Sequence, residues 1–162
     1  KIFMKNILRK LTFILSCSIL LLFVSCNPTY PDDGFFKVGE KSYNINEAFL
    51  TDTGYDNGYY QLRLTMDNSN SYDSHSINFL FYSEVNEYLP SGIYVPYLYD
   101  DKYDNRFKRG AWMTGDVEAG AILKGRVKVT KSNDTYTVRI DCEDINGNPI
   151  SGEYKGKIKV TY

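Results

Sequence analysis

The sequence predicts an all-β protein, an antiparallel β-sandwich or barrel of about 8–10 strands that follows an N-terminal signal helix. Three observations support this fold class. Apolar and polar residues alternate with a period of two in several segments, which is typical of strands with one buried face. Turn-forming Gly, Asn, Asp and Pro residues separate these segments at short spacing. After residue 25, we find no segment with a convincing helical period.

The first half of the β region contains short strands and one long one. We expect strands over 35–38 and 42–45, and another over 48–52, although residues 46–49 could instead form one helical turn. Residues 52–58 are rich in Asp, Asn and Gly and predict a loop. The strand expected over 59–66 has the clearest alternation, and its buried face would carry Tyr60, Leu62, Leu64 and Met66.

The middle of the chain is less regular. Residues 77–83 are apolar on both faces, which indicates a central strand. A strand follows at 93–98, with Pro96 near an edge or a bulge because proline cannot donate a ladder hydrogen bond. We expect a charged loop over 100–110 and a weaker strand over 111–114.

In the C-terminal third, the alternation of apolar and polar residues predicts three long strands, over 122–130, 135–143 and 150–162. The dipeptide Asn146-Gly147 is a strong hairpin signal, because both residues tolerate positive φ. The alternation defines an inward face. We place on that face Val127, Val129, Tyr136, Val138, Ile140, Cys142, Tyr154, Ile158, Val160 and Tyr162.

The N-terminal residues predict export and a lipid anchor. Residues 1–10 are basic and residues 11–24 mainly apolar, the pattern of a secretory signal peptide. The apolar run is shorter than the roughly 20 residues of a membrane-spanning helix. Phe23-Val24-Ser25-Cys26 resembles the bacterial lipobox, which implies cleavage after Ser25 and acylation of Cys26. We therefore predict a signal peptide over 1–25, a tether over 26–34 and one domain over 35–162.

The C-terminal hairpins carry a family resemblance. Residues 125–129, 134–138, 144–147 and 150–156 resemble the end of small uncharacterised lipoproteins from Bacteroidota. The resemblance covers about a quarter of the chain and rests on hairpin residues, which specify a fold better than a function. It implies an envelope lipoprotein of the outer membrane, periplasmic or surface-exposed, with an all-β and calycin-like domain. It implies no catalytic residue.

Composition argues against several function classes. Residues 1–25 hold four of the 19 basic residues and none of the 20 acidic ones, so the remainder has a net charge of −5. This balance argues against nucleic acid as a partner. A single histidine, His75, leaves little for a zinc site or a Ser-His-Asp triad. We therefore expect no enzyme, no cofactor and no metal, although the acidic loops leave calcium open as a weaker alternative.

Tyrosine supplies the first candidate binding site, with 15 residues in the chain. Tyr94, Tyr97 and Tyr99 lie close together in the sequence, near Trp112 and Tyr103. Exposed aromatic rings stack on sugars and are common at recognition surfaces. In a strand, however, Tyr97 and Tyr99 would share one face and Tyr94 would take the other. The alternative is that these tyrosines simply pack the sheet.

A basic stripe supplies the second candidate. On the outward faces of the last strands we expect Arg126, Lys128, Arg139, Lys155, Lys157 and Lys159, with Asp141 and Glu153 among them. A clustered positive field attracts anionic glycans or lipid headgroups. The alternative is that these residues keep the protein soluble and protect an edge strand.

Together these features favour a lipid-anchored envelope protein whose non-enzymatic β-domain binds or scaffolds a glycan or a partner protein. A calycin-like carrier of a small apolar ligand is the second hypothesis. A hydrolase that uses paired carboxylates is the third, with Asp100, Asp101 and Asp104 as candidates.

Overall fold

The structure is a computed structural model that describes residues 33–68, 74–97, 102–115 and 118–161. The predicted signal helix, Cys26 and most of the predicted tether lie outside the described residues, as do Tyr99, Asp100, Asp101 and Tyr162. In the described residues, no helix is long and apolar enough to span a membrane.

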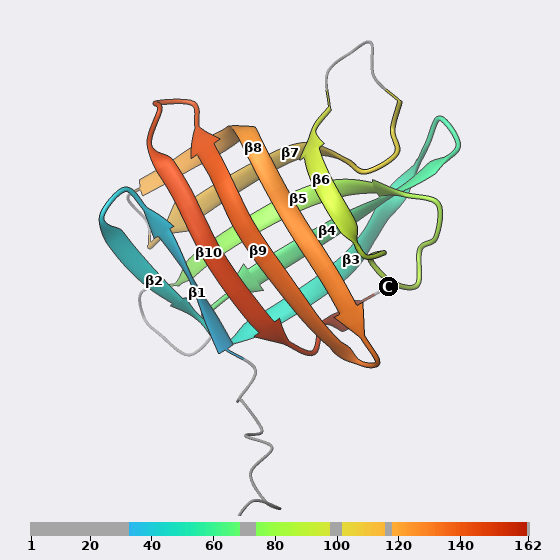
Figure 1. The fold of residues 1–162 in the computed structure, drawn as a ribbon, viewed down its shortest axis with the longest axis horizontal. Coiled ribbons are helices and arrows are strands. Elements are labelled where there is room, and N and C mark those ends of the chain that lie inside the picture. Colours follow the sequence, from blue (N-terminus) through green and yellow to red (C-terminus); the bar gives the residue numbers. More distant parts are fainter. Residues whose placement is uncertain (1–32, 69–73, 98–101, 116–117, 162) are drawn as a thin grey trace, which may run out of the picture.

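The predicted all-β class is confirmed, because the described residues form one strongly curled sheet of eleven strands and no helix. The strands are β1 (Asp33–Val38), β2 (Lys41–Ile45), β3 (Glu47–Asp56), β4 (Tyr59–Asp67), β5 (His75–Ser83), β6 (Gly92–Pro96), β7 (Arg106–Thr114), β8 (Glu118–Ser132), β9 (Thr135–Asp144), β10 (Pro149–Gly156) and β11 (Lys159–Thr161). Figure 1 shows β8, β9, β10 and β1 crossing in front of β3, β4 and β5. A single sheet curled in this way is a half-barrel, so the barrel alternative describes it better than two separate sheets.

The strand order is β11-β3-β4-β5-β7-β6-β8-β9-β10-β1-β2, and β7 also pairs with β8. Most neighbours are antiparallel, as short hairpin connections require. Two pairs are parallel, β11 with β3 and β6 with β7. The two strands at the ends of this order are β2 and β11.

The core lies on the concave face of the sheet and follows the predicted alternation. Leu62, Leu64 and Met66 are buried, as are all the inward residues expected on β8 and β9. Aromatic side chains fill the space between the two sides of the half-barrel. The ring of Phe79 lies 5.5 Å from that of Phe107, and the ring of Phe81 lies 4.7 Å from that of Tyr94.

The prediction of one strand over 150–162 is wrong, because the chain leaves β10 after Gly156. The Tyr154 hydroxyl donates a 2.6 Å hydrogen bond to the carbonyl of Lys157. The chain then pairs with β3, so β11 lies at the opposite end of the strand order. This change of partner breaks the alternation, and Val160, which was expected inside, is 39% exposed.

Two predicted loops are shorter than expected. Strand β3 continues to Asp56 through an irregularity between Asp52 and Tyr55, and the turn falls on Asn57 and Gly58, both with positive φ. Strand β7 begins at Arg106, inside the predicted loop over 100–110. Its first residues are Arg106, Lys108 and Arg109 around the single buried Phe107, and the register shifts here, so the segment has the composition of a charged loop.

Candidate functional site

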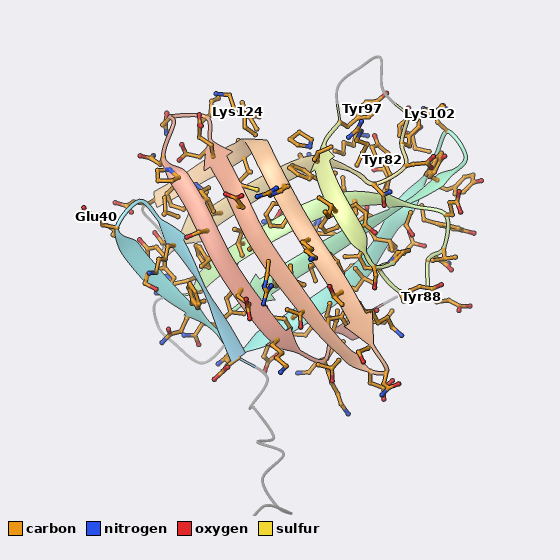
Figure 2. All side chains as sticks on the ribbon, viewed as in Figure 1. Glu40, Tyr82, Tyr88, Tyr97, Lys102 and Lys124 are labelled. Atoms are coloured by element: carbon orange, nitrogen blue, oxygen red, sulfur yellow. The ribbon has the colours of Figure 1, made fainter. Side chains whose placement is uncertain are left out.

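A cluster of four tyrosines covers the convex face of the sheet near the end of β5. Tyr59 and Tyr82 come from β4 and β5, whereas Tyr97 and Tyr103 come from the segment between β6 and β7. We call these four residues the tyrosine cluster. Figure 2 shows Tyr82 and Tyr97 close together beside that segment. The cluster explains why residues 80–83 of β5 are buried on both faces.

The cluster is joined by ring contacts and hydrogen bonds. The Tyr103 ring stacks on Tyr97 at 4.9 Å and meets Tyr82 edge-on at 4.4 Å. The Tyr59 ring lies 5.3 Å from that of Tyr103, and its hydroxyl donates a 2.8 Å hydrogen bond to Asp104. Asn57 Nδ2 donates to the Tyr103 hydroxyl at 2.8 Å. The β3–β4 turn and the β6–β7 segment are therefore tied together over the sheet.

Beside the cluster lies a cleft of about 440 Å³, which we call the tyrosine cleft. Its wall brings together residues from four parts of the chain: Tyr59, Tyr82, Ser83, Glu84, Val85, Tyr88, Pro90, Tyr94, Asp104 and Asn105. The volume falls within the about 300–1,000 Å³ that is usual for small-molecule sites. The wall combines aromatic rings with carboxylate, amide and hydroxyl groups.

The cleft is acidic and presents hydrogen-bonding groups. Glu84 and Asp104 line it, and no Lys or Arg is among its lining residues. The hydrogen bond to Asp104 is the main reason why the pKa of Tyr59 lies above its ordinary value of 10.0. The Tyr59 hydroxyl is neutral at physiological pH, as an ordinary tyrosine also is, and it donates its proton to Asp104. A neutral or cationic ligand fits this charge better than an anionic one.

Tyr88 is the most exposed aromatic ring in the wall, at 39%. Lys131 Nζ lies 5.4 Å from its ring centroid and 5.8 Å from that of Tyr136. A cation at this distance attracts the ring face and restrains the side chain. Tyr88 therefore offers a partly fixed aromatic surface at the edge of the cleft.

The structure separates the aromatic residues that the sequence grouped together. Tyr97 belongs to the tyrosine cluster. Tyr94 is buried in the core, where its hydroxyl donates a 2.8 Å hydrogen bond to the Pro90 carbonyl, and it reaches the cleft as part of the wall. Trp112 is buried on β7 opposite Ile77 and Gly120 and does not line the cleft.

Sequence reasoning missed most of the cleft: it did not single out Tyr59, Tyr82, Glu84 or Tyr88 as site residues. Tyr59 lies on β4, Tyr82 lies on β5, and Glu84 and Tyr88 lie in the segment between β5 and β6. One usable signal was the two-sided apolar strand over 77–83. A strand with two apolar faces needs a second layer over its convex face, and nearby tyrosines could supply that layer.

Four residues of the predicted basic stripe, Arg126, Lys128, Arg139 and Lys155, lie exposed on the convex face of β8, β9 and β10, where acidic residues divide them. Lys157 lies after the end of β10 and Lys159 lies on β11, so these two do not belong to the same row. Arg126 pairs with Asp141 at 3.0 Å, and Arg139 pairs with Glu153 at 2.7 Å. A shallow groove of about 560 Å³ runs between these pairs, with Phe35 at one end and Ile93 at the other. At the far edge of the sheet, Lys159 pairs with Glu47 at 3.1 Å.

The remaining chemical candidates are the cysteine Cys142, the histidine His75 and possible metal sites. Cys142 is buried, and burial is the main cause that raises the pKa of its thiol to about 11, so the reactive thiolate is disfavoured. The His75 ring lies 4.8 Å from the ring of Tyr43. In the part of the chain that the structure describes, no group of three or more His, Cys, Asp or Glu could hold a metal ion.

Comparisons of the chain with family models, with curated proteins and with solved structures return no match.

Proposed function

We propose that this protein is a lipid-anchored protein of the cell envelope whose β-domain binds a glycan at the tyrosine cleft. The observation that carries the proposal is the composition of the cleft wall, which combines aromatic rings with two carboxylates, an amide and hydroxyl groups. Sugar rings present C–H groups that pack on aromatic faces and hydroxyl groups that need hydrogen-bond partners. The cleft offers both kinds of contact.

Tyr88 is the stacking surface in this proposal, and Glu84 and Asp104 accept hydrogen bonds from sugar hydroxyls. Glu84 is exposed, so its carboxylate is available to a ligand. Asp104 already accepts a hydrogen bond from Tyr59, which holds one of its oxygens in place. The anionic wall favours a neutral or amino sugar over an acidic one.

The calycin-like carrier has less support. Such a carrier needs an open interior, and the concave face here holds Phe79, Phe81 and Phe107 in mutual contact. The paired-carboxylate hydrolase has no observation in its favour beyond the two acids in the cleft wall.

Glycan binding is tested with the full chain in a nonionic detergent. A glycan array identifies the ligand, and calorimetry then compares the wild type with Tyr88→Ala and Glu84→Gln. Because an aromatic contact contributes up to about 1.5 kcal/mol, we expect Tyr88→Ala to weaken binding by roughly tenfold. Tyr55→Ala is the matched control, since Tyr55 is exposed on β3 and does not line the cleft. An array without any bound glycan, or an equal loss in the control, contradicts the proposal.

The anchor is tested separately by growing cells with a radiolabelled fatty acid. We expect label on the wild-type chain and on Cys17→Ser, and none on Cys26→Ser, because Cys26 follows the predicted cleavage point. Label that persists on Cys26→Ser would show that the anchor is assigned to the wrong residue.

A further inference from the structure

Four side chains form a square on the convex face of β8 and β9. The register places Lys128 directly opposite Arg139, and Thr130 directly opposite Thr137. Residues two apart on a strand share a face, so both pairs point to the same side. These four residues line a hollow of about 210 Å³. We call them the oxyanion cradle.

A third cation borders the oxyanion cradle. Lys155 of β10 lies directly opposite Thr137, on the other side from Thr130. Neighbouring strands are about 4.8 Å apart, so the Lys155 side chain starts one strand away from the two threonines. Three cationic side chains therefore lie near the two threonines, two of them in the lining of the hollow and Lys155 beside it.

The charges in the oxyanion cradle are less well balanced than those in the adjacent row. In that row, Arg126 is directly opposite Asp141 and pairs with it. In the cradle, Lys128 is directly opposite another cation, and like charges in this position repel each other. Arg139 turns toward Glu153, whereas none of the ion pairs among the described residues includes Lys128. Glu153 therefore offsets the charge of Arg139, and the charge of Lys128 is the one that an anion bound in the hollow would balance.

The donor set suits a tetrahedral oxyanion. Arg139 donates to Glu153 through Nε, so its terminal N–H groups and the Lys128 ammonium are the charged donors. The two threonines add O–H donors. We propose that the oxyanion cradle binds a phosphate or sulfate group carried by an anionic ligand. This site lies on a different part of the sheet from the tyrosine cleft and does not depend on glycan binding there.

The test follows backbone amide resonances of the isotope-labelled full chain in nonionic detergent during titration with inorganic phosphate and with sulfate. We expect saturable shifts at residues 128–130 and 137–139, and binding that weakens as sodium chloride screens the charges. Lys128→Gln should weaken binding by about tenfold, the usual effect of removing one charge-assisted hydrogen bond. Arg126→Gln removes the same charge from the adjacent row and should change the affinity much less.

The double variant Thr130→Val/Thr137→Val separates a built site from a diffuse positive field. Valine keeps the shape and the strand preference of threonine and leaves every charge in place. We expect this variant to bind phosphate several-fold more weakly. Unchanged affinity in the valine variant, or equal losses in Lys128→Gln and Arg126→Gln, overturns the proposal.

Competition experiments identify the source of the group. Vesicles of phosphatidic acid in phosphatidylcholine present it as a lipid headgroup, and a sulfated oligosaccharide presents it on a glycan. Displacement of phosphate by either one, lost in Lys128→Gln, supports the oxyanion cradle and assigns its ligand. If no saturable shift appears with phosphate, sulfate, vesicles or oligosaccharide, the proposal is wrong.

Discussion

The convex face of the sheet has two regions with opposite character. Over the C-terminal end of β5, the tyrosine cluster covers the face, and the strand segment from Leu80 to Ser83 is buried on both sides. Over β8, β9 and β10, the same face is open to solvent and carries charged residues in cross-strand pairs. The strands beneath are continuous members of one sheet, so the difference comes from what covers them.

In one region the side chains on this face mainly stabilise the fold, and in the other they remain exposed and accessible to a ligand. In the covered region, tyrosines bury their rings and keep their hydroxyls for hydrogen bonds, and an acidic cleft forms at the edge of the cover. In the open region, charges stay on long flexible side chains and contribute little to stability, because solvent screens exposed pairs. We therefore expect mutations in the two regions to have very different effects.

Tyr82→Ala should have the largest effect on stability. Tyr82 is 3% exposed and contacts the rings of Tyr97 and Tyr103, so truncation removes a buried ring and leaves a cavity. We expect the free energy of unfolding to fall by about 3 kcal/mol, measured by urea denaturation.

Two control variants separate the loss of the buried ring from the loss of a hydroxyl group or of an exposed charge. Tyr82→Phe keeps the ring and should change the free energy of unfolding by less than about 1 kcal/mol. Arg139→Ala removes an exposed charge from the open region and should change it by less than about 0.5 kcal/mol. Equal losses from Tyr82→Ala and Arg139→Ala would mean that the tyrosine cluster does not hold the β6–β7 segment against the sheet.

Asp144 should have the next largest effect, because it is a buried acid beside the open region. Its carboxylate accepts hydrogen bonds from the Asn146 and Asn148 amides and from the Asn148 side chain, at 2.8 to 2.9 Å. Burial by itself would raise the pKa of Asp144, but these hydrogen bonds, above all those from Asn148, hold it below the ordinary 3.8. The β9–β10 turn is thus stabilised by the ionised form.

A lowered pKa fixes the sign of the pH dependence. The stability from Asp144 is present above the unfolded value near 3.8 and is lost as the pH falls through the lower folded value. At neutral pH, we expect Asp144→Ala to reduce the free energy of unfolding by about 2 kcal/mol. The difference from wild type should shrink when urea denaturation is repeated at about pH 3. Asp141→Ala, in an exposed pair, should show a much smaller difference at both pH values, and a constant difference for Asp144→Ala would contradict the assignment.

The alternating segments show how far sequence reasoning reached. Alternation predicted β4, β8, β9 and the start of β10, including the burial of Leu62, Val129 and Val138, because side chains on a strand face opposite sides with a period of two. Asn146-Gly147 marked the β9–β10 turn correctly, with Gly147 at positive φ. These features depend on neighbours in the chain, so one sequence is enough to find them.

The candidate sites depend on contacts between distant residues, and there the sequence was a poorer guide. Tyr59 and Asp104 are 45 positions apart and meet at 2.8 Å, which no local pattern indicates. Trp112 seemed close to the tyrosines in sequence, yet β7 turns it into the core. The oxyanion cradle required the register between β8 and β9, although Lys128 and Arg139 were already named as outward charges.

The all-β class, the buried faces of the long strands and the residues that predict a lipid anchor could all be read from the sequence. Those properties follow from side-chain alternation, turn chemistry and the order of basic, apolar and small residues. The tertiary structure alone decided that one sheet curls into a half-barrel, that β11 crosses to pair with β3, and that the tyrosines cover β5. Strand partners and covering layers depend on burial and register across the whole molecule. They therefore involve residues that are far apart in the chain.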